Sequence, residues 1–326
     1  MKKWVWVFLI LIVGLGVEYG VRLVWRRKIS EIEIVQPKQF PYLKYSIVNL
    51  GMRNYSGSEI IFDEVKSKTE KYYVEPFSYM SDGKKVTGIA HISNGCSVEK
   101  KCPVIVQFRG YAEVEGYYSG YGTSRSAQVF ANNGYITLAP DFLGYGGSDM
   151  PDKDVWIARF ETYTSTVNLL ESVKKWEYSN GKIGIWGHSN GGQIALTVLE
   201  ITQGKYATVV WNPVSVYFPY SVLYFTDDND DEGVALRKEV QRLENEYNLQ
   251  GFSLTVHLER INAPILLQQG SADESVPQKW SDALFNKLKS LEKDVDYQVY
   301  PGADHNMVPG WEKVIDKDLE FYKSKL

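Results

Sequence analysis

Apolar residues in the last two thirds of the chain fall into two recurring patterns. Short, nearly continuous apolar runs bounded by glycine or proline alternate with longer stretches that suit helices, and such short runs are typical of strands buried on both faces. The predicted strands are Val104–Phe108, Tyr135–Ala139, Lys182–Trp186, Thr208–Trp211, Pro264–Gln268 and Tyr297–Tyr300. The predicted helices are Gly122–Asn132, Thr164–Trp176, Gly191–Ile201, Pro277–Leu291 and Trp311–Lys323. This alternation predicts an α/β fold with a mostly parallel central sheet and helices on both faces.

Two regions depart from the alternation. From Tyr42 to Ser93, brief β-favouring runs and an alternating stretch, interrupted by a turn at Ser81-Asp82-Gly83, predict an antiparallel β region that leads into the main sheet. Residues of about 213–261 contain an aromatic stretch, an acidic run and a predicted helix near Val234–Tyr247. We expect this insertion to lie above the sheet as a small cap.

The aromatic stretch of the cap includes Tyr217, Phe218 and Tyr220. These are candidate contacts for an apolar or aromatic group of a bound molecule.

The first 28 residues differ in kind from the rest. Two lysines precede an apolar run, Trp4–Val17, of about 14 residues or roughly 21 Å of helix, which is short for a hydrocarbon core of roughly 30 Å. Extension to Trp25 supplies the missing length. We therefore predict a transmembrane anchor over residues 1–28 and a linker over 29–41, followed by the α/β domain over 42–326. A cleaved signal peptide and a buried helix of the fold are the alternatives.

The charges and the cysteines favour different sides of the membrane for the domain. Four basic residues between positions 22 and 28 outnumber the two lysines before the run, which favours a cytoplasmic domain. The only two cysteines, Cys96 and Cys102, flank a turn-like segment and are well placed to pair in an oxidising compartment, with two unrelated thiols as the alternative. We expect a membrane-held domain outside the cytoplasm; a secreted and a cytoplasm-facing form are the alternatives.

Composition narrows the function classes. The 326 residues are 44% hydrophobic and 23% charged, as in ordinary globular proteins, so wholesale disorder is excluded. A net charge of −4 gives no basic face for nucleic acid. The sequence does not define an oligomeric state.

A nucleophile motif follows the predicted strand Lys182–Trp186. Residues Gly187-His188-Ser189-Asn190-Gly191 fit G-x-S-x-G between a strand and a helix, where a sharp turn holds the serine oxygen clear of the sheet. The backbone N–H of Asn190, at the start of the helix, can stabilise negative charge on a reacting oxygen. We predict that Ser189 is a nucleophile and that His188 points away from it and packs.

A serine nucleophile needs a base, and the chain has four histidines. His305 follows the last predicted strand, at the edge where reacting groups converge in an open parallel sheet, and is the predicted base. His91 and His257 are more in keeping with structural roles.

The third group should orient the imidazole. Asp273 follows the strand Pro264–Gln268 and lies between nucleophile and base in chain order, which makes it the predicted acid. Glu274 and Asp304 are the competitors, and Asp304 is better suited to shaping its own loop.

Together these motifs resemble the α/β-hydrolase superfamily and, more narrowly, the catalytic domain of the prolyl oligopeptidase (S9) peptidases. The likeness spans about residues 80–326. The four motifs that carry it, in the family's order, are Pro140–Ser148, Gly187–Gly192, Gly270–Pro277 and Gly302–His305. The resemblance implies a Ser189, Asp273 and His305 triad with a cofactor-free and metal-free mechanism.

Two departures from the family bear on activity. Members usually carry His-Gly after the first central strand, whereas this chain has Arg109-Gly110-Tyr111; the Tyr111 N–H can still complete the oxyanion hole with that of Asn190. The roughly 60 residues between linker and sheet are too few for a β-propeller, so we expect no size selection of peptides by one.

A weaker signal lies in the acidic run. Asp228-x-Asp230-x-Glu232-Gly233 followed by Glu239 nearly fits a calcium loop, but Glu232 replaces the expected Asp or Asn. A solvated loop that caps the following helix is the preferred interpretation, and we predict no metal site.

Three functions fit these features. The first is two-step acyl transfer by an S9-like serine peptidase, and the second is a carboxylesterase or dienelactone-hydrolase-like esterase with the same triad. The third, from another class, is a membrane-anchored binding module on an inactive hydrolase fold. The expected partners are a small-molecule or peptide substrate and the membrane.

Overall fold

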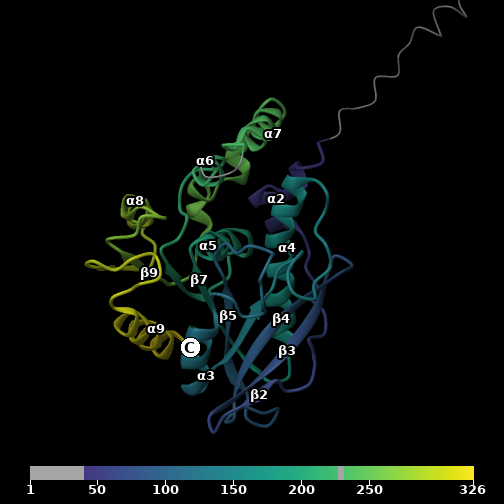
Figure 1. The fold of residues 1–326 in the computed structure, drawn as a ribbon, viewed down its shortest axis with the longest axis vertical. Helices are drawn as coiled ribbons and strands as arrows, with labels where there is room; N and C mark the ends of the chain where they lie inside the picture. Colours follow the sequence, from purple (N-terminus) through teal and green to yellow (C-terminus); the bar gives the residue numbers. More distant parts are fainter. Residues whose placement is uncertain (1–39, 227–230) are drawn as a thin grey trace, which may run out of the picture. The chain divides into compact units, whose positions relative to one another are not determined.

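The computed structural model describes residues 40–226 and 231–326. The chain divides into two units, Met1–Pro41 and Tyr42–Leu326, and the fold below is that of the second. Its described residues form a 10-stranded sheet of order β1-β3-β4-β6-β5-β7-β8-β9-β10, with β2 beside β3 (Figure 1). The strands are β1 Ile61–Phe62, β2 Ser67–Lys68, β3 Tyr72–Ser81, β4 Lys84–Ser93, β5 Cys102–Phe108, β6 Ile136–Pro140, β7 Ser179–His188, β8 Ala207–Trp211, β9 Ile265–Gly270 and β10 Val295–Tyr300.

The sheet is mixed. Strands β6, β5, β7, β8, β9 and β10 run parallel, whereas β1, β2, β3 and β4 pair antiparallel with their neighbours and join the parallel part through β4 and β6. The β3–β4 hairpin turns at Asp82-Gly83, both at positive φ, a conformation that suits a two-residue hairpin turn. The α/β architecture and the antiparallel entry are therefore confirmed.

Helices cover both faces because successive residues of the buried strands point to opposite sides. Val104, Val106 and Ile185 contribute to a core beneath α4 and α5, whereas Ile105 and Trp186 pack against α3 and α9. The helices are α2 Ile47–Met52, α3 Ser124–Asn132, α4 Val155–Lys175, α5 Asn190–Thr202, α6 Tyr220–Leu223, α7 Val234–Glu244, α8 Gln278–Ser290 and α9 Trp311–Lys325. The 3-10 turns are η1 Leu43–Tyr45, η2 Leu249–Phe252, η3 Leu254–Val256 and η4 Leu258–Arg260.

Helix α4 begins nine residues before the predicted start at Thr164. Asp154 caps it, since its Oδ1 accepts the backbone N–H groups of Trp156 at 2.9 Å and Ile157 at 3.2 Å. Trp156 is also fully buried, so the first turns are held by packing as well as by the cap.

The insertion between β8 and β9 contains α6, α7 and the three turns η2, η3 and η4. In Figure 1 α6 and α7 lie beyond the end of the sheet where β7 passes into α5. The turns contribute Leu249, Phe252 and Leu254 to the main core, so the cap is packed onto the domain.

No helix in the described ranges is long and apolar enough to cross a membrane. The predicted anchor over residues 1–28, and the linker up to residue 39, lie outside the described residues.

Candidate active site

Ser189 occupies the turn between β7, which ends at His188, and α5, which begins at Asn190. Its backbone has φ 57° and ψ −120°, a region that a side-chain-bearing residue adopts only where surrounding structure imposes it. The turn is tight: a Cβ on Gly187 would lie 2.4 Å from the Gly191 carbonyl oxygen, and one on Gly191 would lie 2.0 Å from that of Phe108. Glycine is therefore required at both positions, and the serine is held at a nucleophile elbow.

Two main-chain donors lie next to the nucleophile. Asn190 follows Ser189 in the chain, and Gly110, which precedes Tyr111, lies against Ser189, since a Cβ built on it would be 3.7 Å from Ser189 Oγ. Within the described residues, the backbone N–H groups of Asn190 and Tyr111 donate to no protein group. Both are therefore free to bind an oxyanion, which is the role predicted for them.

The loop after β9 and the loop after β10 bring an acid and a base together. His305 Nδ1 lies 2.7 Å from Asp273 Oδ2, and the Asp273 side chain is fully buried. Asp273 Oδ1 accepts the N–H groups of Ser275 at 2.9 Å and Val276 at 2.7 Å. These bonds fix the carboxylate, so it can hold the imidazole and stabilise its charged form.

Ser189 and His305 share no hydrogen bond in the described structure. The elbow and the histidine loop nevertheless touch, because the His188 and His305 rings lie 4.6 Å apart between centroids. Bonds between nucleophile and base are often long before substrate binds, so this geometry is compatible with the predicted pair.

The other titratable candidates form no hydrogen bond with the side chains of Ser189, Asp273 or His305 in the described structure. Asp304 Oδ1 accepts the N–H groups of Asn306 and Val308, both at 2.8 Å, within its own loop. His91 is buried in β4, and burial lowers its pKa to about 4. His257 Nε2 lies 3.0 Å from the Gln250 carbonyl oxygen in the cap.

His188 does more than pack. Its Nε2 lies 2.7 Å from the His305 carbonyl oxygen and so donates to it. Burial, with the neighbouring His305 ring, lowers the pKa of His188 to about 4, so the ring is neutral at neutral pH.

Arg109 is buried among aromatic rings beside the nucleophile elbow. It is 6% exposed, and its guanidinium lies 4.1 Å from the Tyr145 ring centroid and 4.8 Å from that of Tyr117. It donates to the carbonyl oxygens of Gly110 at 2.9 Å and Asp141 at 3.1 Å. Arg109 thus connects the loop after β5, residues 109–111, to the loop after β6. Sequence reasoning missed this role, although the aromatic residues of the loop after β6 are a signal for it.

Asn212, which sequence reasoning also passed over, contacts both the acid loop and the histidine loop. No motif marks it.

The cap prediction needs one correction. Tyr217 and Tyr220 are 41% and 47% exposed, whereas Phe218 is 2% exposed and its ring packs edge-on against Trp156. Phe218 is therefore a core residue beneath the cap and presents no free face to a substrate.

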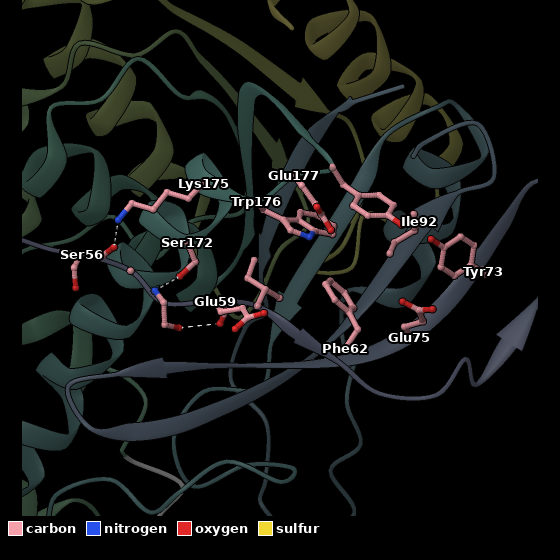
Figure 2. A pocket seen from close by; sticks show the side chains of 14 residues that line it. Ser56, Glu59, Phe62, Tyr73, Glu75, Ile92, Ser172, Lys175, Trp176 and Glu177 are labelled. Carbon is pink, nitrogen blue, oxygen red and sulfur yellow. Dashed lines mark hydrogen bonds between the residues drawn. The ribbon is translucent and has the colours of Figure 1, made fainter. Parts of the chain in front are cut away.

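The cavity in Figure 2, of about 700 Å³, is remote from these residues. Its aromatic wall is a stack in which Trp176 lies between Phe62 and Tyr178, at 5.2 and 5.3 Å between centroids. Tyr178 precedes β7 and Ser189 follows it, so the strand's roughly 30 Å length separates cavity and nucleophile. This cavity is not where the reaction occurs.

The acidic run gives no metal cluster in the part of the chain that is described. Asp228 and Asp230 lie outside the described residues. Asp231 accepts the N–H groups of Gly233 at 2.9 Å and Ala235 at 2.8 Å, which caps the start of α7.

Cys96 and Cys102 form a disulfide across the turn before β5. Cys102 begins β5 and the oxyanion loop follows the end of that strand, so the bridge lies at the far end of β5 from Ser189.

The elbow, the paired acid and base and the free main-chain donors define a serine hydrolase of the α/β-hydrolase fold. The family model of the prolyl oligopeptidase family matches residues 121–326. The chain belongs to that family.

Relatives agree with this membership. The chain is 26% identical over 244 residues to the uncharacterised peptidase YtmA of Bacillus subtilis, with 71% of this chain and 90% of that protein covered. It is also 26% identical over 216 residues to a probable dipeptidyl-aminopeptidase B of Ajellomyces dermatitidis. That match spans 64% of this chain but 22% of the relative.

Solved structures show the same fold. An acetyl xylan esterase from Paenibacillus sp. R4 superposes with a TM-score of 0.63 at 18% identity, over 85% of this chain and 91% of the esterase. The acylaminoacyl peptidase of Pyrococcus horikoshii gives 0.62 at 23% identity, over 79% of this chain and 42% of the peptidase.

Proposed function

We propose that this chain hydrolyses peptide bonds through an acyl-enzyme formed on Ser189. Ser189 Oγ bonds to the carbonyl carbon as its proton passes to His305 Nε2, while the N–H groups of Asn190 and Tyr111 receive the oxyanion. The C–N bond then breaks, and the amine leaves with the proton from His305. Water then attacks the acyl carbon as its proton passes to His305. The bond from that carbon to Ser189 Oγ breaks, the acid is released, and His305 returns the proton to Ser189.

The observation that carries this proposal is the 2.7 Å bond between His305 and the buried Asp273, on loops beside an elbow with φ 57° at Ser189. Asp273 accepts a hydrogen bond from the Nδ1–H of His305, so Nε2 is left to take the serine proton. A fold without catalysis has no need for either feature.

Peptidase activity is the first choice because the family and YtmA are described as peptidases. Carboxylesterase activity is the second candidate, since the acetyl xylan esterase matches nearly the whole domain with the same fold. Both reactions use the same groups, so the triad does not separate them.

A hydrolysis panel tests the proposal. Purified protein is assayed on p-nitrophenyl acyl esters and on aminoacyl and prolyl amides, and labelled with a fluorophosphonate probe. We expect turnover of at least one amide and labelling of the wild type, and neither in Ser189→Ala. Ser290→Ala, an exposed serine at the end of α8, is the matched control and should behave as wild type.

Other outcomes decide between the alternatives. Ester turnover without amide turnover supports the carboxylesterase. Folded wild-type protein that neither turns over substrates nor takes the probe supports the inactive binding module and refutes the proposed function.

We also propose that the domain works outside the cytoplasm, held by the apolar segment Trp4–Trp25. The Cys96–Cys102 disulfide supports an oxidising compartment. Protease treatment of intact cells should remove the domain, and denatured protein should show free thiols only after reduction. Protection from protease in intact but not in lysed cells would contradict this location.

A further inference from the structure

The main-chain carbonyl of His305 receives two side-chain donors. Asn212 Nδ2 lies 2.8 Å from this oxygen and His188 Nε2 lies 2.7 Å from it. A carbonyl oxygen has two lone pairs, so the two bonds use its full capacity. One donor comes from the nucleophile elbow and the other from the residue after β8.

Asn212 also holds the acid loop. The side-chain Oδ1 of Asn212 accepts the N–H of Gly270, the last residue of β9, at 2.8 Å. The backbone N–H of Asn212 donates to the Gln268 carbonyl at 2.9 Å. The residue is fully buried and has φ 44°, a conformation that asparagine tolerates better than most residues. Acceptor and donor ends of one amide are thus directed at two different loops.

Trp211 and Val214, which are close to Asn212 in the chain, form hydrogen bonds with the main chain of Ser189. The Trp211 carbonyl accepts the Ser189 N–H at 2.9 Å, and the Val214 N–H donates to the Ser189 carbonyl at 3.1 Å. Residues 211–214 therefore contact the chain segments of all three triad members.

We propose that Asn212 is a positioning residue that sets the His305 imidazole relative to Ser189 and Asp273, with His188 as the second donor to the same carbonyl. This inference rests on the proposed function. Loss of either donor frees one side of the His305 main chain, and the ring then moves relative to both partners. A displacement of about 1 Å in a reacting group can lower a rate by about 100-fold.

Substitutions at both donors test the proposal. Asn212→Asp keeps the size and the acceptor but loses the donor, and Asn212→Ala loses both. We expect kcat to fall by about 10- to 100-fold with KM changed less than threefold. His188→Leu should lower kcat similarly, whereas His188→Gln, whose amide can reach the same carbonyl, should recover most of that loss.

Asn168→Ala is the control for removing a buried asparagine. Asn168 lies in α4, is 6% exposed and donates to Ser81 Oγ at 2.9 Å, so its loss should lower stability with kcat unchanged. If Asn212→Ala does not fold, the isosteric Asn212→Asp and the two His188 variants still decide.

Folded Asn212→Asp with wild-type kcat, or equal activity of His188→Leu and His188→Gln, would overturn the inference. Failure of the proposed function is distinct, because it would be seen without any Asn212 or His188 variant, either as a folded wild type that neither turns over substrates nor takes the probe or as activity that survives in Ser189→Ala.

Discussion

Glu200 lies in α5 with no exposed surface, and neither of its carboxyl oxygens has a hydrogen-bond partner among the described residues. Burial raises the pKa of Glu200 well above its usual 4.5, with the charge of Glu259 adding to the effect and that of Arg260 opposing it. A carboxyl group in such surroundings keeps its proton to a higher pH than an exposed one, since ionising it without a partner would cost several kcal/mol. Glu200 therefore makes folding stability depend on pH.

The sign follows from the direction of the shift. The folded pKa is above the unfolded one, so the group's contribution is fully present below about pH 4.5 and is lost as pH rises through the folded pKa. In that interval the loss is up to about 1.4 kcal/mol per pH unit. Glu200→Gln keeps the shape of the side chain and removes its titratable group. Its free energy of unfolding relative to wild type should therefore increase from pH 5 towards pH 8 and level off above the folded pKa.

Urea unfolding of both proteins at four pH values between 5 and 8 measures this difference. Other titrating groups, common to both proteins, cancel in the comparison. Glu244→Gln, on the exposed face of α7, is the matched control for a glutamate-to-glutamine exchange. A Glu200→Gln difference that does not change with pH, or that decreases with pH, would refute a protonated buried carboxyl.

Three further variants probe the site and the disulfide. Asp273→Asn should lower kcat/KM by about 10⁴-fold, because an amide can favour the wrong tautomer of His305; steady-state kinetics measures it. Arg109→Met removes two charged donors from the loops beside the oxyanion hole, so kcat should fall by at least about 10-fold and the thermal midpoint should drop; unchanged kcat would separate Arg109 from catalysis. Replacing both Cys96 and Cys102 by serine should lower the free energy of unfolding by about 2 kcal/mol and leave kcat unchanged. An altered kcat would contradict the separation of bridge and site along β5.

Local features explain which predictions succeeded. The parallel strands were located to within a few residues because each is an apolar run ended by glycine or proline, and both signals lie in the run itself. The elbow and the two loops after β9 and β10 could be chosen for the same reason, since motif and chain order suffice. The structure then places Asp273 and His305 within hydrogen-bonding distance.

What the sequence could not give depends on contacts between distant segments. The contacts of Arg109 could not be predicted from its motif, because two of its ring partners lie in the loop after β6, more than 30 residues later in the chain. Asn212 has no signature, because its function arises from the neighbouring ends of β8 and β9 and from the loop after β10. Phe218 belongs to an aromatic stretch whose burial is decided by Trp156, some 60 residues earlier in the chain.

One buried carboxyl group links the three strands that lead into the site. Asp318 of α9 is fully buried and accepts the indole N–H groups of Trp186 and Trp211, both at 3.1 Å, and the amide of Gln268. Burial raises its pKa well above the usual value despite these three donors.

Each of these three donors precedes a site residue by one or two positions on its strand: Trp186 before His188, Trp211 before Asn212 and Gln268 before Gly270. Asp318 therefore links β7, β8 and β9 through one hydrogen bond to each strand. The two donors to the His305 carbonyl hold the main chain of the base. The Ser189 hydroxyl, by contrast, takes part in no hydrogen bond within the described residues. A bond to His305 on substrate binding would therefore require no existing protein hydrogen bond of this hydroxyl to break.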